Sequence, residues 1–446
     1  MKTHKLFIIL LTALVLPICI QAQDAGVTDV SDISKILPER ERAEVMNRWL
    51  EWRLENIVPM LMRRNGIEMW LIICREYNED PVYMSLVPEP AMAARRTSIL
   101  IFHDRGEEGV ERLTGSFYGM DEWYTGIWND KSVDQFDNLA RFIEERDPQT
   151  IGINESTHWA FGDGLTAGLK AELLRPLDNK YRDRLVSAEE LCVGWLETRS
   201  PQELSVYRHI VGIAHDIIKE FFSNRVIVPG ITRTEEVQWW IRQKITDIGL
   251  DTWFHPSVDI QRSPEDAGIY SVREGIIRRG DVLHCDIGIM YLGLATDTQQ
   301  MAYVCRLGEE DAPEGLKQAF RNGNRLQDIF MNEFVTGRTG NEILRISLQK
   351  AKAEGLIPSI YTHPLGYHGH AAGPTIGLWN AQEGVPVRGD YPLYENTAYS
   401  IELNNQTPVP EWSGQLVRIA LEEDASHTSA GCIFIDKRQT GYYLIK

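Results

Sequence analysis

Hydrophobic residues recur along the chain at the two spacings that distinguish helices from strands. Residues 41–64 carry apolar side chains at rough helical spacing, whereas 69–74 and 97–104 are continuous apolar runs typical of buried strands. Residues 138–146 again favour a helix, and residues 150–154 favour a strand. This alternation predicts an α/β unit in the first part of the chain.

A second unit begins at Ser200, where the pattern changes. Ser200, Pro201 and Glu203 carry the signature of a capped helix start, and Thr232 and Glu235 repeat the capping pair. The remaining predicted elements are helices near 313–335 and 340–355 and strands near 252–261, 281–290, 294–304, 397–406 and 415–425. The order of helix pair, strands, helix pair and strands indicates a duplicated α+β unit.

The first residues have the pattern of a secretory signal. Residues 1–22 combine a basic start at Lys2 and Lys5 with the apolar run Leu6–Ile20, which is too short to span a bilayer, and end on a small residue. We therefore expect cleavage and a secreted or periplasmic protein. The alternatives are a buried N-terminal helix and a lipoprotein anchored through Cys19.

These boundaries divide the chain into four parts. They are a signal segment (1–22), a loose polar lead-in (23–40), an α/β N-terminal domain (41–195) and a C-terminal domain (196–446). No other stretch has the apolar length of a membrane span, so the sequence predicts none in the exported protein.

Composition narrows the function classes. Hydrophobic content of 43% and charged content of 25% are typical of a globular protein. The formal net charge of −18 disfavours nucleic acid and anionic membranes as partners. The cysteines are widely spaced and form no C-x-x-C pair, so neither a zinc knuckle nor a dithiol redox site is indicated.

A predicted hairpin over residues 280–304 carries two aspartates. Asp286 and Asp297 are placed symmetrically about the turn sequence MYLG, so we expect them to face each other with Cβ atoms roughly 5 Å apart. Two ionised carboxylates in this arrangement repel each other, and they need a metal, a shared proton or full exposure to solvent. Two solvent-facing acids therefore remain an alternative to a site.

Further candidate ligands follow downstream. Glu402 lies in the middle of the strand-like run 398–406, and Glu422 shares a strand face with Arg418. A charged side chain in mid-strand is costly if it is buried. Residues 363–370, HPLGYHGH, contain three of the 11 histidines of the chain. Together these groups indicate a site.

Four carboxylates and an imidazole form an oxygen-rich ligand set. Such a set suits a pair of divalent ions such as manganese, cobalt, iron or zinc better than one ion. A single zinc ion favours nitrogen or sulfur ligands and fewer acids. Two metals can activate a shared water molecule for attack on a carbonyl group, so the composition of the set predicts hydrolysis.

The C-terminal part resembles the pita-bread metallopeptidases, which include methionine aminopeptidase, Xaa-Pro aminopeptidase, prolidase and the non-peptidase creatinase. The resemblance rests on the two aspartates of one hairpin, on the motif H-x-[LI]-G-x-x-x-H at His363–His370, and on two downstream glutamates. It implies two divalent metals, with Mn²⁺ expected and Co²⁺, Fe²⁺ or Zn²⁺ as alternatives. The implied ligands are Asp286, Asp297, His363, Glu402 and Glu422.

The same resemblance implies roles for other residues. His370 matches the histidine that steadies the substrate carbonyl or the leaving group, and Glu402 also matches a general base. Arg418 matches an arginine that supports this region and that we count among the catalytic residues. The family commonly has Arg-x-Glu here, so Glu422 is two residues late; Glu423 is the alternative, but it points to the other strand face.

One family position differs. Active members carry a histidine about 17 residues before the first aspartate, where this chain has Ile269. His255 and His284 are nearby but do not match the position, although His284 shares a strand face with Asp286. His368 matches no family role and is interpreted as a loop residue.

Fold and function follow from the resemblance as expectations. It implies an α+β protein with a C-terminal pita-bread catalytic domain, built from a duplicated α-β unit and preceded by a smaller creatinase-like α/β domain, and it implies a homodimer. The expected activity is metal-dependent exopeptidase cleavage of short peptides next to proline, as an Xaa-Pro aminopeptidase or Xaa-Pro dipeptidase. The alternatives are a creatinase-like amidinohydrolase and a catalytically impaired peptide-binding homologue.

Overall fold

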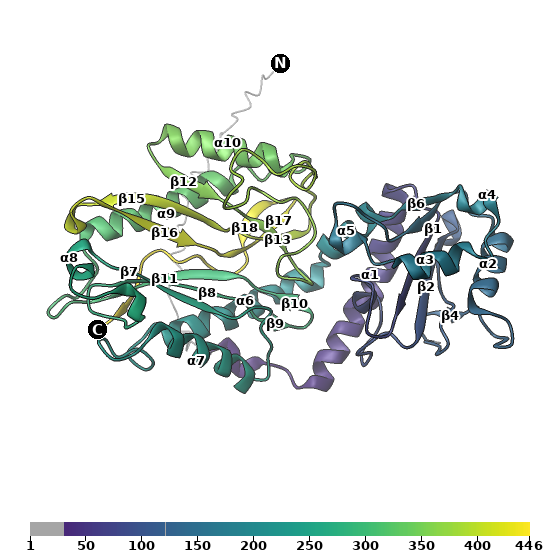
Figure 1. The fold of residues 1–446 in the computed structure, drawn as a ribbon, viewed down its shortest axis with the longest axis horizontal. Helices are drawn as coiled ribbons and strands as arrows, with labels where there is room; N and C mark the ends of the chain where they lie inside the picture. The colour runs from purple at the N-terminus through teal and green to yellow at the C-terminus, as the bar shows by residue number, and fades with distance from the viewer. Residues whose placement is uncertain (1–30, 121) are drawn as a thin grey trace, which may run out of the picture.

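The computed structural model describes residues 31–120 and 122–446, and the predicted signal peptide at 1–22 lies outside them. The chain forms a smaller N-terminal unit and a larger C-terminal unit that lie next to each other along the long axis of the molecule (Figure 1). Within the described residues, no helix has the length and apolar character that crossing a membrane requires.

The N-terminal unit is a mixed six-stranded sheet covered on both faces. Its strands, in the order β4-β3-β2-β1-β5-β6, are β1 (Met69–Arg75), β2 (Thr97–Asp104), β3 (Val110–Thr114), β4 (Thr125–Gly126), β5 (Ile151–Ile153) and β6 (Leu185–Ser187). Its helices are α1 (Glu39–Arg64), α2 (Gln135–Arg146), α3 (Ala167–Leu174), α4 (Asn179–Arg182) and α5 (Glu189–Glu197). Both faces of β1 are buried, because Trp70 and Ile72 join the core beneath α1 and α5 while Leu71 and Ile73 join the core beneath α2 and α3. This burial explains the continuous apolar runs of the strands.

The C-terminal unit repeats one arrangement of two helices and a sheet. The first repeat contains α6 (Pro201–Phe221), α7 (Thr234–Asp247), β7 (Ser257–Gln261), α8 (Pro264–Ala267), β8 (Val282–Ile287), β9 (Met290–Tyr291), β10 (Leu294–Ala295) and β11 (Thr298–Val304). The second contains α9 (Glu314–Met331), α10 (Gly340–Ala353), β12 (Ile357–Ile360), β13 (His363–Leu365), β14 (Thr397–Ser400), β15 (Leu403–Val409), β16 (Gln415–Leu421), β17 (Asp424–Thr428), β18 (Gly431–Phe434) and β19 (Tyr443–Ile445).

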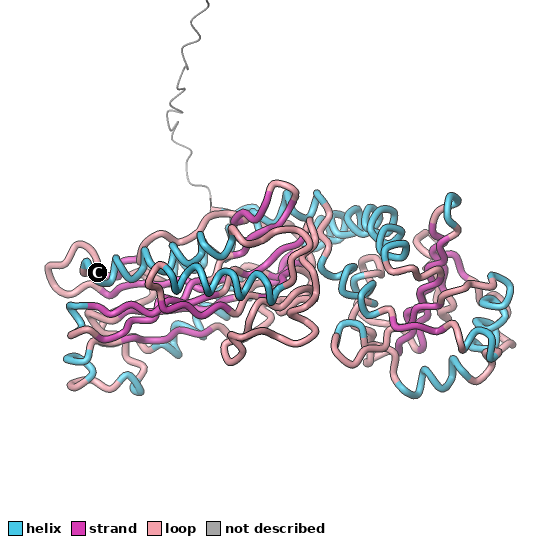
Figure 2. Tube along the Cα trace, turned by 90° about the horizontal axis from the view of Figure 1, so that it is seen from above, coloured by secondary structure: helices cyan, strands magenta, loops and turns pink. Residues whose placement is uncertain are grey.

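Three sheets of this unit lie between the helix pairs, with α9 and α10 on one side and α6 and α7 on the other (Figure 1). Their strand orders are β19-β11-β8-β7, β12-β15-β16 and β13-β14-β17-β18. The strands run along the long axis of the molecule (Figure 2). The predicted fold class, a duplicated α+β unit preceded by a smaller α/β unit, is confirmed.

The predicted helix starts are confirmed at one position and displaced by one residue at the other. Ser200 Oγ accepts a hydrogen bond from the Glu203 backbone N–H at 3.0 Å, and Glu203 caps Ser200 in return. At the second helix Glu236, not Glu235, caps the backbone of Arg233. Thr232 Oγ1 instead accepts from the Val228 backbone N–H and closes the preceding turn.

The described part of the lead-in is not loose. A short 3₁₀ turn, Asp32–Lys35, packs on α6, where Asp32 Oδ1 lies 3.1 Å from His209 Nδ1. The Asp32 backbone N–H donates to Asp216 Oδ2 at 2.7 Å. The chain therefore contacts the C-terminal unit before α1 leads it into the N-terminal unit.

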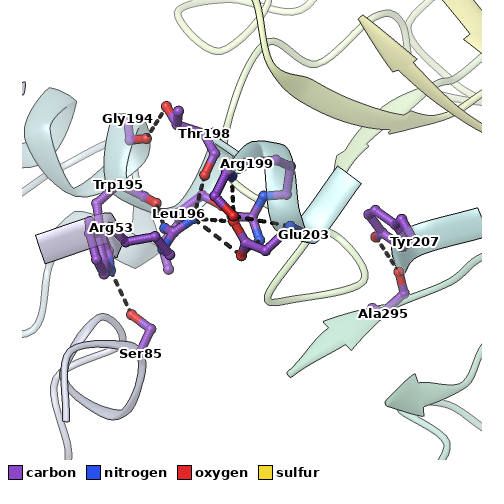
Figure 3. Close-up of polar contacts among 11 residues, drawn as sticks. Arg53, Ser85, Gly194, Trp195, Leu196, Thr198, Arg199, Glu203, Tyr207 and Ala295 are labelled. Atoms are coloured by element: carbon purple, nitrogen blue, oxygen red, sulfur yellow. Dashed lines mark hydrogen bonds and ion pairs between the residues drawn. The ribbon is translucent and has the colours of Figure 1, made fainter. Parts of the chain in front are cut away.

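A buried ionic network joins the two units (Figure 3). Arg53 of α1 donates to Glu203 Oε2 at 2.9 Å and to the Thr198 carbonyl, while Arg199 donates to Glu203 Oε1 at 3.1 Å. Burial alone would raise the pKa of Glu203, but the two guanidinium groups lower it below its usual value. Arg199 also packs against Gly366, where an added Cβ would lie 3.2 Å from the Arg199 Cζ. The network therefore reaches residues His363–His370, which we call the histidine loop.

Candidate metal centre

One row of residues crosses the strands of the C-terminal unit. Ser257, Asp286, Gln299 and Glu422 are directly opposed in turn. The registers of Leu403 with Leu421 and with Ile360, continued by one residue, add Glu402 and Tyr361 to the row. Directly opposed residues of antiparallel strands point to the same face. The row passes from the first repeat to the second because Gln299 and Glu422 exchange two backbone hydrogen bonds of 3.0 Å. We call these six residues the first row.

A second row lies two residues along the chain from the first. It contains Asp297, Asp424, Ser400 and His363. Ser400 is opposed to Asp424 on one side and to His363 on the other. The Asp297 backbone N–H donates to Asp424 Oδ1 at 3.2 Å. Asp286, Glu422 and Glu402 of the first row and Asp297 and His363 of the second therefore project from one face.

The sequence suggested that Glu402 and Glu422 lie in mid-strand, but neither does. The predicted strand 397–406 is divided into β14 and β15 on either side of Ile401–Glu402, and the strand 415–425 is divided into β16 and β17 at Glu422–Glu423. The register nevertheless continues through both breaks, because Ile401 N–H donates to the Glu423 carbonyl. Both glutamates thus sit on the line where the chain passes from one sheet to the next.

The expected direct opposition of Asp286 and Asp297 is wrong. The hairpin closes through Leu292 and Gly293, whose φ angles are 54° and 69°. Two successive residues with positive φ are typical of a two-residue type I′ turn. This turn places Gln299 opposite Asp286 and moves Asp297 two residues along, on the same face. The carboxylates still meet, since one oxygen each of Asp286, Asp297 and Glu422 lie within 4.8 Å of one another.

His363 presents one nitrogen to these acids. Its Nδ1 lies 2.9 Å from the Pro364 carbonyl, so Nδ1 carries the proton and Nε2 is left as an acceptor. Nε2 lies 3.4 Å from Asp297 Oδ2 and 3.6 Å from Glu422 Oε1. Ligand atoms of His363, Glu402 and Glu422 also lie within 4.8 Å of one another. All five predicted ligands are therefore brought together.

The acids are buried against one another, which disfavours their charged forms. Burial and the neighbouring Glu422 raise the pKa of Asp286 to about 8. Burial, and then Glu422, also raise the pKa values of Asp297 and Glu402 well above their usual range. Among the described residues, four buried oxygens of the candidate ligands have no hydrogen-bond partner: Asp286 Oδ1, Asp297 Oδ1, Glu422 Oε1 and Glu422 Oε2.

This donor set fits divalent metals. Buried carboxylate oxygens without partners are costly unless a proton or a cation compensates them. Oxygen ligands with a single imidazole match the preference of manganese and similar divalent ions. Metal binding would replace the protons that the raised pKa values indicate.

Glu423 faces away from this cluster. Its Oε2 lies 2.8 Å from His215 Nε2, and its Oε1 accepts from Gln300 Nε2 at 2.7 Å. The alternation along the strand therefore separates Glu422 from Glu423, and it is Glu422 that meets Asp286 and Asp297.

His370 and Arg418 differ in their relation to the cluster. His370 offers a nitrogen within 4.8 Å of ligand atoms of Asp297 and His363, and its ring centroid lies 4.5 Å from that of His363. Burial and the nearby His363 lower the pKa of His370. Arg418 is exposed, and its backbone pairs with the Gln261 side chain on β7.

Ile269 is 67% exposed and lies in the connection between β7 and β8, after α8 and before a 3₁₀ turn at Val272–Glu274. The residue of β7 opposite Asp286 is Ser257, and β7 (SVDIQ) contains no histidine.

A pocket of about 450 Å³ opens beside the cluster. His363, Glu402 and His370 form one side, and residues of both units complete the wall: His158, Trp159, Ala160, Phe161, Tyr361, Ala371, Thr375, Leu378, Trp379 and Arg388. His368, interpreted from sequence as a loop residue, stacks on Phe161 with ring centroids 4.7 Å apart. The contact holds the histidine loop against the N-terminal unit.

The sequence analysis missed three first-row residues, Ser257, Gln299 and Tyr361. They join the row through strand register, and Tyr361 also lines the pocket. Gln299 could have been recognised, because it lies two residues after Asp297 and must share its strand face. Tyr361 had no such signal, since its place follows from a pairing with a strand far away in the sequence.

Comparisons with known proteins bear on the family of the C-terminal unit and on the fold. Residues 205–426 match the model of metallopeptidase family M24. An X-Pro aminopeptidase from Thermotoga maritima MSB8 has a similar structure, with a TM-score of 0.59, 17% identity, and 86% of this chain and 99% of that chain covered. An Xaa-Pro dipeptidase from Bacillus anthracis gives a TM-score of 0.59 at 17% identity, covering 91% of this chain and 99% of that one. The prolidase from Pyrococcus furiosus gives 0.54 at 16% identity, with 85% and 99% covered. A search of curated proteins found no match.

Proposed function

Because residues 205–426 belong to metallopeptidase family M24, we propose that the protein is a dinuclear metal-dependent exopeptidase that hydrolyses peptide bonds next to proline. The observation that carries this proposal is the convergence of five buried or half-buried ligands around unpartnered carboxylate oxygens. Asp286, Asp297, His363, Glu402 and Glu422 would hold the metals. Mn²⁺ is the proposed ion because oxygen ligands dominate the set.

When bound, the two metals would activate a water molecule and polarise the substrate carbonyl. Glu402 lines the pocket and keeps one carboxylate oxygen free, since Oε1 already accepts a hydrogen bond from Gln299. That free oxygen would accept the proton that the water molecule loses. His370, neutral because its pKa is lowered, would donate a hydrogen bond to the carbonyl oxygen or the leaving nitrogen.

The pocket supports a short substrate with an apolar ring. Its volume of about 450 Å³ suits a small ligand, and Trp159, Phe161 and Trp379 give its walls flat apolar surfaces. These surfaces match the pyrrolidine ring of proline, and two solved structures named for X-Pro or Xaa-Pro peptidases share the fold.

Arg388 favours a dipeptidase over an aminopeptidase. Among the described residues that line the pocket it is the one permanent cation, and its exposed guanidinium has no carboxylate partner in the described part of the chain. A guanidinium at this place would bind the carboxylate of a dipeptide ending in proline. An aminopeptidase substrate would carry a further residue there instead.

Two parts of the proposal rest on the sequence. The secretory pattern at residues 1–22 supports an exported location, and the resemblance to the two-domain members of the family supports a homodimer.

A catalytically impaired homologue remains the second candidate, because no histidine of β7 lies beside Asp286.

The experiment is to express the chain from residue 23, load it with Mn²⁺, and measure metal content and hydrolysis of Ala-Pro, Ala-Pro-Ala and Ala-Ala. We expect two metals per chain, cleavage of Ala-Pro in preference to Ala-Pro-Ala, and no cleavage of Ala-Ala. Metal binding without cleavage would favour the impaired homologue, and absence of both would overturn the proposal.

A further inference from the structure

Gln299 occupies the central position among the candidate ligands. Its backbone is opposed to Asp286 on one side and to Glu422 on the other, and its side chain is only 4% exposed. Its Nε2 donates to Glu402 Oε1 at 2.6 Å. A single residue that is not itself a metal ligand therefore contacts three of the candidate ligands.

The other end of the Gln299 amide is held by His284. His284 Nε2 lies 2.8 Å from Gln299 Oε1, and the imidazole is buried with 5% exposure. An amide oxygen only accepts hydrogen bonds, so His284 Nε2 must carry the proton. On the far side of the ring, Nδ1 lies 3.7 Å from Asp259 Oδ2 on β7.

The Glu402 carboxylate sets the orientation of this amide. An ionised carboxylate only accepts hydrogen bonds, so Gln299 must turn its NH₂ group to Glu402 and its oxygen to His284. His284 supports that orientation when its Nε2 carries the proton.

We propose that Gln299 and His284 are positioning residues that hold the Glu402 carboxylate with one oxygen fixed and the other turned to the metals. The proposal rests on the proposed function, since it assigns Glu402 to the metal centre. It gives a role to the chain's own His284–Gln299–Glu402 series, which reaches the centre from β8 through β11.

The physical reason is the freedom of an unsupported carboxylate. A glutamate side chain can rotate its carboxylate about the last bond, and a hydrogen bond to one oxygen removes that freedom and reduces its basicity. Groups that hydrogen-bond to metal ligands typically contribute about 10–100-fold to metal affinity or activity. We expect an effect of this size from Gln299 and from His284.

The first test uses Gln299→Leu with Gln300→Leu as its matched control. Gln300 is the next residue of β11, is 2% exposed, and donates to Glu423 on the opposite face. Both changes remove one buried amide from the same strand. We expect Gln299→Leu to weaken Mn²⁺ binding, measured by chelator competition, and to lower kcat by about 10–100-fold with KM unchanged. Gln300→Leu should leave Mn²⁺ affinity unchanged even if it lowers Tm.

The second test asks whether the two residues act together. His284→Leu should weaken Mn²⁺ binding as Gln299→Leu does, and the double variant should be no weaker than either single variant. His284→Gln returns an N–H near the position of Nε2 and should restore affinity to within about threefold of wild type, well inside the expected loss. Additive losses, no rescue, or equal losses in Gln299→Leu and Gln300→Leu would overturn the proposal.

Failure of this proposal is distinguishable from failure of the proposed function. Mn²⁺ affinity is measured without substrate, so it tests the positioning role whether or not the wild-type protein cleaves Xaa-Pro peptides. If the wild-type protein binds Mn²⁺ and Gln299→Leu binds it equally well, the positioning role is wrong and the metal centre stands. If the wild-type protein binds no Mn²⁺, both are wrong.

Discussion

Asp286 and Glu422 lie on strands that do not pair with each other, yet their carboxylate oxygens approach within 4.8 Å. The residue between them is Gln299, whose backbone is opposed to both. Asp286 comes from the first repeat of the C-terminal unit and Glu422 from the second. The candidate metal centre is therefore built at the junction of the repeats, and each repeat alone holds only part of it.

Asp297→Asn tests the assignment of the ligands. An amide has the same shape as the carboxylate but no charge, so it removes the interaction with a cation while keeping the packing. We expect the variant to lose at least one Mn²⁺ ion and nearly all turnover, as measured by metal analysis and peptide hydrolysis. Full metal stoichiometry in Asp297→Asn would contradict the assignment.

His370→Ala separates metal binding from catalysis. His370 lines the pocket and meets Asp297 and His363, but it is exposed. We expect both metals to be retained and kcat to fall by about 10²–10⁴-fold, as for other positioned acid–base groups. Loss of metal from His370→Ala would mean that the roles of His363 and His370 are exchanged.

Strand periodicity predicted the membership of the centre better than its geometry. The alternation of facing residues selected Asp286, Asp297 and Glu422 and set Glu423 apart, because face parity survives any even shift in register. The same alternation could not locate the turn, so the predicted opposition of Asp286 and Asp297 was wrong. The residue opposite Asp286 is Gln299, two residues after Asp297. A positive φ at a leucine, here Leu292, is uncommon and leaves no sequence signal.

Long-range pairing was the second limit. The breaks that place Glu402 and Glu422 between two sheets depend on strands that are far apart in sequence, and local pattern describes each as one continuous strand. Arg418 was selected by motif, and its role stays a prediction.

Arg388→Ala tests substrate length. If Arg388 binds the carboxylate of an Xaa-Pro dipeptide, its loss removes a charge-assisted hydrogen bond of about 1.5–3 kcal/mol and raises KM by about 10–100-fold. The amidated substrate Ala-Pro-NH₂ has no carboxylate, so its KM should not change. Arg345→Ala, an exposed arginine on α10, serves as the control. Equal effects on both substrates would contradict carboxylate recognition.

Gly293→Val tests the turn that sets the hairpin register. Gly293 has a φ of 69°, which a β-branched residue adopts only at a cost of about 1–2 kcal/mol. We expect the free energy of unfolding in urea to fall by that amount and Mn²⁺ affinity to fall with it, since Asp297 depends on the register. Gly293→Asn tolerates the same φ and should retain both. A fully stable Gly293→Val variant would show that the turn does not need this conformation.

The metal-free protein should become less stable as pH rises. This is the opposite of the usual effect of carboxyl groups whose pKa is lowered by folding. The folded-state pKa of Asp286 is raised to about 8, and those of Asp297 and Glu402 are also raised, whereas unfolded carboxyls titrate near ~4. Between these values the folded protein binds more protons than the unfolded chain, so the free energy of unfolding falls as pH rises. We expect the Tm of the chelator-treated protein to fall from pH 5 to pH 8.

Mn²⁺ should remove this decline, because metal binding requires the deprotonated acids and becomes stronger over the same range. Asp286→Asn provides the control, since it cannot titrate and should flatten the pH dependence of Tm without metal. A Tm for the metal-free protein that rises between pH 5 and pH 8 would mean that these carboxylates are ionised in the fold, compensated by some group other than a proton or a cation.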